Sequence, residues 1–308
     1  MLDYSLIIPI YCNQDNVNSL FQALKGLDES LNHQCEFIFV IDGSPDESEF
    51  LINQSRDKYV THSRVISLSR NYGSFTAIRA GLEEATTKYI AVMAADLQEP
   101  PSLILDFFKK LSDGQYDIVF GQRLSRNDPA IKTFLSNMYW DFYSKFIISD
   151  MPKGGVDIFA CNKQVRDSIV SINEINSSLV AQLFWVGFKR GFVPYHRQER
   201  KEGKSAWSFR KRFKYMLDSI FSYSDLPIIV LLSLGLLGLT LSLIYIFIVS
   251  LAYVFGYIQQ PGFATQTVLI ATFGSAILFS QGILGCYIWR VLENSKKRPL
   301  FFKKNNEK

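Results

Sequence analysis

From Leu226 to Trp289 the chain contains no Asp, Glu, Lys, Arg or His, and this uncharged stretch limits the folds that are open to it. Two apolar segments within it, 228–255 and 265–289, each exceed the roughly 20 residues that a helix needs to cross a bilayer. A break rich in Gly, Gln and Pro separates them. We therefore expect residues 227–290 to form two transmembrane helices.

The sequences on both sides of the uncharged stretch are basic, whereas the loop between its two apolar segments has no Lys or Arg. The positive-inside rule then places both termini and residues 1–205 in the cytoplasm of a multi-pass membrane protein. Because the net charge of the whole chain is only +4, these local clusters favour anionic membrane lipids over nucleic acid.

Two stretches outside the apolar segments have apolar residues at helical spacing. Residues 206–226 carry basic residues on the polar face, which predicts an amphipathic helix at the membrane surface. Residues 130–149 are expected to form a second interfacial helix, although a helix that only covers the sheet has the same pattern. Residues 291–308 are expected to be a basic cytoplasmic tail.

The first 205 residues alternate short β-branched apolar runs with helical patterns. Such alternation predicts an α/β domain with a mostly parallel sheet that is covered by helices on both faces. The expected strands are residues 5–11, 36–41, 64–68, 89–93 and 117–121, and the expected helices between them include 17–27, 74–85 and 103–111.

Two carboxylates follow expected strands, at the place where open α/β sheets bind ligands. Asp96 comes after the strand that starts at Tyr89, and with Gln98 it offers two oxygen ligands to a hard divalent cation. Asp42 comes directly after the strand 36–41. A purely local role, in which each aspartate stabilises its own turn, is the alternative for both residues.

Six motifs occur in this order along the chain: Ser5–Tyr11, Asp42–Ser44, Arg70–Gly73, Asp96–Pro101, Arg200–Ser205 and the C-terminal Gly285–Pro299. With these motifs, the chain resembles family 2 glycosyltransferases of the polyprenyl-phosphate sugar synthase type, which include bactoprenol glucosyltransferases and dolichol-phosphate mannose synthases. The last motif resembles the end of the two-helix bacterial members.

The resemblance implies a Rossmann-like GT-A fold, a nucleotide-sugar donor, a divalent metal (Mg²⁺ or Mn²⁺) and a polyprenyl phosphate acceptor. It also implies a homo-oligomer, a tetramer in relatives, in a bacterial inner membrane. By the same resemblance, the donor-binding residues are Pro9, Tyr11, Asp42, Ser44, Arg70, Asn71, Gly73 and Asp96.

Further roles are carried over by the same resemblance. Asp96 and Gln98 would hold the metal, and Asp157, in the stretch Gly154–Phe159, would be the catalytic acid or base together with Asp96. A lipid phosphate is already mostly ionised at neutral pH, so Asp157 has little proton transfer to do. The residues expected to bind that phosphate are Arg197, Arg200, Lys204 and Ser205.

The chain departs from the family pattern at three places. Ala94 and Ile41 stand where most relatives have an acid, so a metal here would rely more on diphosphate oxygens and water. Ser205 is followed by Ala206, where relatives usually have a lysine. A membrane scaffold that binds nucleotide sugars without turnover is therefore one alternative function.

The expected activity is inverting transfer of one sugar, most simply glucose or another hexose from a UDP-sugar, to undecaprenyl phosphate. The product would serve the modification of surface polysaccharide in the cell envelope. The alternative within the same enzyme class is direct transfer to a hydroxyl of a lipid-linked oligosaccharide.

Overall fold

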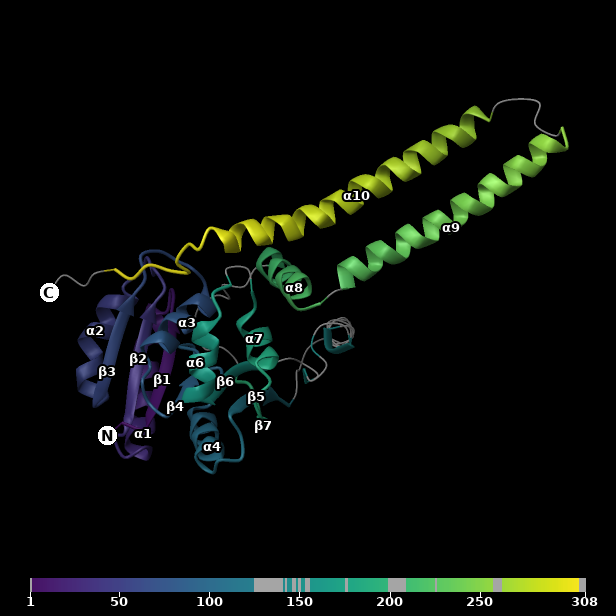
Figure 1. Cartoon of the computed structure of the whole chain (residues 1–308). Helices are drawn as coiled ribbons and strands as arrows, with labels where there is room; N and C mark the ends of the chain where they lie inside the picture. Colours follow the sequence, from purple (N-terminus) through teal and green to yellow (C-terminus); the bar gives the residue numbers. More distant parts are fainter. Residues whose placement is uncertain are drawn as a thin grey trace. The chain divides into compact units, whose positions relative to one another are not determined.

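The computed structural model describes residues 2–124, 141, 143–145, 148, 151–152, 156–174, 177–198, 209–224, 226–256 and 262–304 (Figure 1). The chain divides into two compact units. The first comprises Met1–Tyr215 together with Arg298–Lys308, and the second comprises Met216–Lys297.

The first unit contains a sheet in the order β3-β2-β1-β4-β6-β5-β7. The strands β1, β2, β3 and β4 pair in parallel, and β7 pairs in parallel with β5. Strand β6 is antiparallel to both of its neighbours, β4 and β5. The strands are β1 Tyr4–Ile10, β2 Cys35–Ile41, β3 His62–Ser67, β4 Tyr89–Val92, β5 Ile118–Arg123, β6 Val156–Asn162 and β7 Arg190–Tyr195.

The mostly parallel sheet and its first five strands confirm the sequence prediction. Central strands such as β2 are buried along their whole length, and a strand that is buried on both faces reads as a continuous apolar run. Strands β6 and β7 were not predicted. The antiparallel β6 is an insertion between two strands of the opposite direction, which the alternating pattern did not reveal.

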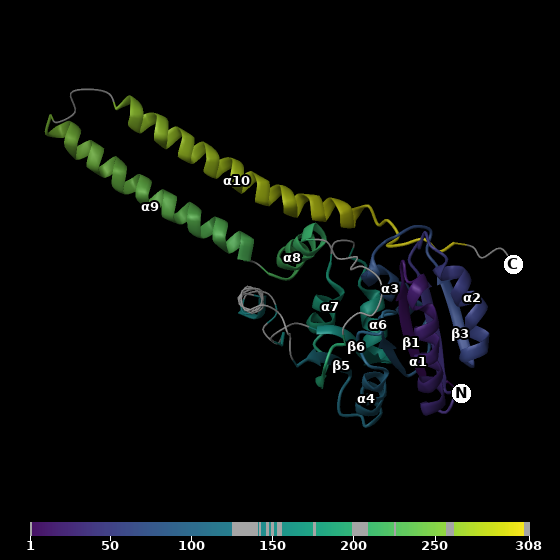
Figure 2. The same ribbon diagram turned by 180° about the vertical axis from the view of Figure 1, so that it is seen from behind.

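Helices cover both faces of the sheet (Figures 1 and 2). One core cluster joins α1, α2 and α4 to the sheet, and the second joins α3, α6 and α7 to the other face. The predicted apolar face of the first helix is buried, with Leu20, Phe21 and Leu24 at its centre. The bounds are η1 Gln14–Asn16, α1 Val17–Ser30, α2 Ser48–Tyr59, α3 Ser74–Glu84, α4 Pro101–Ser112, α6 Lys163–Ser171 and α7 Leu179–Trp185.

Helix α3 lies very close to β1. A Cβ atom added at Gly81 of α3 would lie 2.4 Å from Cγ2 of Ile7, so only glycine allows this approach. Arg79, on the same helix, is buried, and its guanidinium donates to the carbonyl oxygens of Ile169 (2.6 Å) and Ile172 (2.8 Å) at the end of α6. The charge therefore satisfies carbonyl groups that a helix end leaves without partners.

The second unit consists of the end of α8 (Phe209–Tyr223), α9 (Leu226–Val254) and the whole of α10 (Phe263–Ser295). Helices α9 and α10 lie side by side (Figures 1 and 2). Arg290 of α10 donates to Asp218 (2.7 Å) and Ser222 (2.8 Å) of α8. This ion pair joins α8 to α10 within the unit.

Large apolar side chains of α9 and α10 are exposed, for example Leu232 and Ile270, as expected for a surface that contacts lipid rather than water. Within the described residues, Thr272–Ser295 is long and apolar enough to span a membrane. A second candidate span is obtained only if two helical stretches, Met216–Tyr223 and Leu226–Gly238, are counted together as one broken span. The chain bends by 73° between these two stretches. Most of the helix expected at 130–149 lies outside the described residues.

We expect Gly81→Ala to lower the free energy of unfolding by about 1–3 kcal/mol, because the added methyl group would overlap Ile7. Thermal unfolding of the full-length protein in detergent measures the change. Gly26→Ala in α1 is the matched control, since a Cβ at Gly26 meets no atom within 4 Å. That control should be neutral or slightly stabilising. Equal destabilisation by both substitutions would show that packing against β1 does not require Gly81.

Candidate active site

Three neighbouring parallel strands, β1, β2 and β4, end at the same edge of the sheet, which we call the strand-end edge. Ile10 pairs with Ile41 at the ends of β1 and β2, and β4 pairs with the other side of β1. Asp42 directly follows β2, and Asp96 lies in the loop after β4. Ligands of open α/β sheets bind beyond the carboxyl ends of the strands, so this edge is the candidate site.

Asp42 holds the loop that follows β3. Its Oδ1 accepts a hydrogen bond from the backbone N–H of Tyr72 (2.7 Å), and its Oδ2 accepts one from that of Gly73 (2.8 Å). Asp42 is only 2% exposed, and a buried carboxylate is tolerated only when it is hydrogen-bonded. A structural role for Asp42 is therefore visible in its contacts. Its contact with a donor nucleotide stays a prediction.

Two glycines allow this loop to approach the end of β2. Gly43 has φ +59°, and a Cβ atom there would lie 2.3 Å from the carbonyl carbon of Arg70 and 2.5 Å from the backbone N of Asn71. Gly73 has φ +97° and precedes the first residue of α3. Both positions require backbone conformations that side chains disfavour. The Asp42–Gly43 turn and the loop Arg70–Gly73 thus form one closely packed unit.

Arg70 supplies a positive charge at the strand-end edge. Its guanidinium carbon lies 4.2 Å from the centre of the Tyr72 ring, and the Tyr72 hydroxyl is 2.9 Å from Oγ of Ser69. Arg70 and Asn71 are both exposed, whereas Tyr72 is half-buried. A cation stacked on an aromatic ring is partly ordered before any ligand binds. Arg70 is therefore available to an anionic ligand.

The loops after β1 and β2 are joined by a hydrogen-bond network that the sequence did not predict. Ser44 Oγ accepts from the backbone N of Cys12 (2.8 Å) and donates to Asp46 (2.5 Å). Asp46 also accepts from Ser48 Oγ (2.9 Å) and from the backbone N of Gln14 (3.1 Å). The alternation of Ser44, Asp46 and Ser48 is typical of such turns. Ser44 thus has a structural role, and its donor contact stays a prediction.

Hydrogen bonds lower the pKa of Asp46. Burial alone would raise the pKa of this carboxyl, but donation from Ser44, Ser48 and the backbone of Gln14 outweighs it and holds the pKa below the ordinary 3.8. The folded-state pKa is lower than that of the unfolded chain. The network therefore stabilises the fold fully above pH 3.8, and this contribution is lost as the pH falls through the folded-state pKa.

The loop after β4 is joined to the segment after β7. The backbone N of Gln98 donates to Oδ1 of Asp96 (3.4 Å), and the backbone N of Gln198 donates to the Gln98 carbonyl oxygen (2.9 Å). Arg197 donates to the side-chain oxygen of Gln98. The structure thus brings together Asp96, Gln98 and Arg197, which the sequence assigned separately to metal and to lipid phosphate.

A hollow of about 410 Å³ lies between the start of α4 and the end of β7. Arg197 and Gln198 line it, so it adjoins the Asp96–Gln98 loop. The other lining residues are Pro100, Ser102, Leu103, Asp106, Pro194, Tyr195 and His196. Because this hollow lies beside the predicted site residues Asp96, Gln98 and Arg197, we include it in the candidate site, which then reaches the end of β7.

The donor set at Asp96 suits a cation that takes few protein ligands. Asp96 is half-buried rather than enclosed. The side-chain oxygen of Gln98 accepts from the Arg197 guanidinium, so a metal at Gln98 would compete with that cation. Among the described residues, no group of three or more His, Cys, Asp or Glu side chains could hold a metal. A Mg²⁺ or Mn²⁺ ion fits here if the remaining ligands are diphosphate and water oxygens.

The remaining predicted residues are placed only in part. Pro9, in β1, and Tyr11, directly after it, are half-buried at the strand-end edge. Asp157 belongs to β6, but its side chain lies outside what the structure describes. The last three predicted lipid-phosphate residues also lie outside the described residues, namely Arg200, Lys204 and Ser205.

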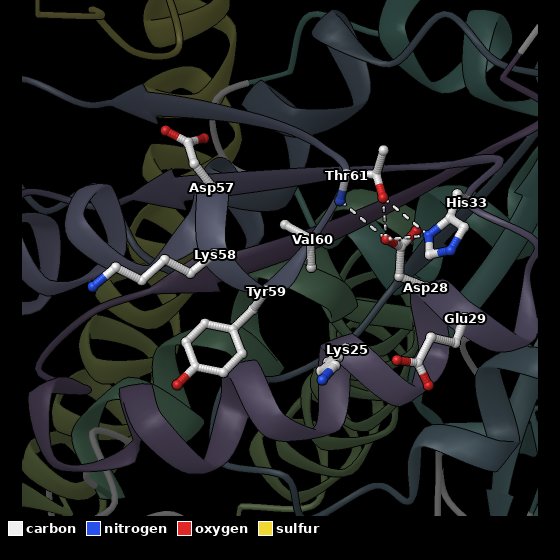
Figure 3. Close-up of a pocket in the computed structure, with 9 residues that line it drawn as sticks. All are labelled: Lys25, Asp28, Glu29, His33, Asp57, Lys58, Tyr59, Val60 and Thr61. Atoms are coloured by element: carbon white, nitrogen blue, oxygen red, sulfur yellow. Dashed lines mark hydrogen bonds and ion pairs between the residues drawn. The ribbon is translucent and has the colours of Figure 1, made fainter.

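A second hollow, of about 200 Å³, lies at the opposite edge of the sheet, near the start of β3 (Figure 3). Asp28 accepts there from the backbone N (3.0 Å) and the hydroxyl (2.8 Å) of Thr61, and lies 2.9 Å from Nδ1 of His33. Figure 3 shows these three side chains turned towards one another. The contacts tie the end of α1 to β3, which is a structural role.

We expect Gly43→Ala to be more destabilising than Gly114→Ala, with a difference of about 1–3 kcal/mol in the free energy of unfolding. Both glycines have positive φ, +59° and +68°, but only the Cβ at Gly43 would overlap backbone atoms. Thermal unfolding in detergent compares the two variants. Equal losses would mean that the loop Arg70–Gly73 does not pack on Gly43 as described.

We expect Asp46→Asn to lower the thermal unfolding midpoint at pH 7, because the amide cannot replace the hydrogen-bonded carboxylate. The difference from the wild type should stay constant down to pH 3.8 and shrink as the pH falls further, in line with the lowered pKa of Asp46. Asp113→Asn, on an exposed turn, is the control for loss of a surface charge. A difference that does not change with pH would contradict the network.

The chain is similar to named glycosyltransferases over nearly its whole length. It is 35% identical over 297 residues to a Bacillus subtilis (strain 168) protein, CsbB, named as a glycosyltransferase, covering 96% of this chain and 89% of the relative. It is 28% identical over 307 residues to the bactoprenol glucosyl transferase of Shigella phage SfV, covering 98% of each protein.

Comparison with solved structures supports the predicted fold. The mannosyltransferase PcManGT from Pyrobaculum calidifontis, solved with GDP-Man and Mn²⁺, superposes with a TM-score of 0.53 at 12% identity, covering 70% of this chain and 62% of that one. At this identity the likeness concerns the fold alone, and it agrees with the expected GT-A architecture. Residues 5–170, more than half of the chain, match the family described as glycosyl transferase family 2. The chain belongs to this family and is a glycosyltransferase.

Proposed function

We propose that the protein transfers one sugar from a nucleotide diphosphate sugar, UDP-glucose or another UDP-hexose, to polyprenyl phosphate. Two relatives that match almost the whole chain are named for bactoprenol glucosyl transfer, one from Shigella phage SfV and one from Escherichia coli (strain K12). The uncharged stretch of this chain, with basic sequences on both sides, suits an enzyme whose acceptor lies in the membrane.

One observation carries the proposal. The Asp96–Gln98 loop is hydrogen-bonded to Arg197 and Gln198, which lead into the basic segment before α8. A donor bound at Asp96 would therefore lie beside Arg197, which we assign to the lipid phosphate. This arrangement brings the two anionic substrates to one place and lets positive side chains offset their repulsion.

On the donor side, Asp96 would hold Mg²⁺ or Mn²⁺. When bound, the ion would neutralise the diphosphate as a Lewis acid and so ease its departure. The exposed guanidinium of Arg70 would donate to the diphosphate oxygens in a bidentate way. Pro9 and Tyr11 would flank the nucleotide base. Asp42 would keep the Arg70–Gly73 loop in position through its two bonds to backbone N–H groups.

On the acceptor side, a phosphate oxygen of the lipid would attack the anomeric carbon of the sugar. The bond from that carbon to the nucleotide diphosphate would break in the same step, and the α-configured donor would give a β-linked product. Asp157 would orient the phosphate or take its last proton. The cations that would bind the lipid phosphate are Arg197, Arg200 and Lys204, with Ser205 as a further hydrogen-bond donor.

The membrane arrangement that we propose is two transmembrane helices, with the catalytic unit and both termini in the cytoplasm of a bacterial inner membrane. Basic residues before α8 and after α10, and their absence from the loop between α9 and α10, support this orientation. Helix α8 would lie at the membrane surface. Assembly as a homo-oligomer, such as a tetramer, would join the membrane helices of several copies.

The test is incubation of the detergent-solubilised protein with undecaprenyl phosphate and a panel of UDP- and GDP-sugars in the presence of Mg²⁺ or Mn²⁺. We expect one donor to give an acid-labile lipid that contains a single sugar. An extended, acid-stable glycan, formed on a lipid-linked oligosaccharide, would favour direct transfer to a hydroxyl. No product from any donor would favour a non-catalytic scaffold.

With the active donor, we expect Asp96→Asn to lower kcat at least about 100-fold. The site would lose the carboxylate that holds the metal, and the metal is what would neutralise the departing diphosphate. Asp113→Asn, an exposed aspartate after α4, should keep wild-type turnover. Initial rates at saturating Mg²⁺ measure both. Wild-type turnover in Asp96→Asn would rule out this residue as the metal ligand.

A further inference from the structure

The residues that follow α10 return to the sheet at the end of β3 (Figure 1). We call the segment Leu300–Lys304 the return segment. Its Lys303 forms an antiparallel bridge with Leu68. The backbone N of Lys304 donates to the Ser67 carbonyl oxygen (2.7 Å), and the backbone N of Ser69 donates to the Phe302 carbonyl oxygen (2.9 Å). The segment therefore pairs with the three residues that lead into the Arg70–Gly73 loop.

The residues Ser67–Ser69 are consequently held on two sides. The backbone N of Leu68 donates to the carbonyl oxygen of Ile41 in β2 (2.8 Å), while the residues on either side of Leu68 bond to the return segment. Strand β3 is the last strand at this side of the sheet. An edge strand without a partner exposes its backbone groups to water, so the return segment replaces a missing neighbour.

Side chains of the return segment reinforce the backbone pairing. Phe301 packs against the core cluster that contains α3. Lys303 pairs with Glu84 at the end of α3, and Glu84 also pairs with Arg64 (3.0 Å). The hydrogen bond from Lys303 is the largest cause of the lowered pKa of Glu84. The return segment thus contacts the end of β3 through its backbone and the last residue of α3 through Lys303.

We propose that the return segment is a positioning element for the donor: it fixes the base of the Arg70–Gly73 loop and so sets the affinity for the nucleotide diphosphate. This inference rests on the proposed donor role of Arg70. Asp42 holds the far end of the loop through Tyr72 and Gly73, and the return segment holds the near end. A loop fixed at both ends loses less conformational entropy when a ligand binds.

A matched pair of variants isolates the backbone contact. Lys304→Pro removes the N–H that donates to Ser67, and Lys304→Ala removes the same charge but keeps the N–H. In the full-length protein in detergent, hydrogen exchange reports the opening of the Tyr72 and Gly73 amides. We expect these two amides to exchange about fivefold faster in Lys304→Pro than in Lys304→Ala. A factor of about five corresponds to the loss of one backbone hydrogen bond. Amides of α1 should keep equal rates in both.

Binding of UDP and Mn²⁺, measured by calorimetry on the same samples, tests the functional part. We expect the Kd for UDP to rise about fivefold in Lys304→Pro and to stay unchanged in Lys304→Ala. Lys303→Ala should give a smaller increase, about twofold, because a half-exposed ion pair contributes little, and Lys303→Arg should restore wild-type affinity.

Two results would overturn the proposal. Equal exchange of Tyr72 and Gly73 in Lys304→Pro and Lys304→Ala would show that the return segment does not hold the loop. Faster exchange with an unchanged Kd for UDP would show that the loop's position does not set donor affinity. If no sugar were transferred to lipid, the proposed function would be refuted but the proposal for the return segment would not. The exchange result depends on neither the sugar nor the acceptor.

Discussion

The buried carboxylate of Asp42 is the interaction on which the strand-end edge depends. It accepts from two consecutive backbone N–H groups, of Tyr72 and Gly73, and thereby fixes the loop between β3 and α3. The adjacent Gly43 lets that loop approach within van der Waals contact. Because α3 begins directly after the loop and packs closely on β1 through Gly81, the same carboxylate also sets where α3 starts.

Each loop of the candidate site is held by a neighbour that is distant in sequence. Ser44 and Asp46 tie the loop after β2 to that after β1. Arg197 and Gln198 tie the loop after β7 to that after β4. A site built in this way is ordered before its substrates arrive, which favours transfer because little binding energy is spent on ordering loops.

The sequence predicts those features that depend on local pattern. Fully buried parallel strands read as apolar runs, so β1 to β5 and the positions of Asp42 and Asp96 at strand ends could be predicted. Strand β7 could not, because it is an edge strand with Gly191 and Pro194 inside it, and both residues are typical of loops.

Long-range pairing is the part that the sequence does not reveal. The Asp42 side chain could equally have capped its own turn or faced a ligand, and only the fold shows that it reaches Tyr72. The contact of Arg197 with Gln98 joins residues about 100 positions apart, and that of Lys303 with Glu84 spans 219. Ion pairs and backbone bridges of this kind leave no periodic signal in a single sequence.

A structure of the protein with UDP and Mn²⁺ bound would locate the donor directly. The proposed site requires Mn²⁺ to be coordinated by Asp96 and the diphosphate to lie beside Arg70 at the strand-end edge. Nucleotide bound at another place, such as the hollow beside Asp28, with Asp96 free of metal, would contradict the assignment of this edge as the donor site.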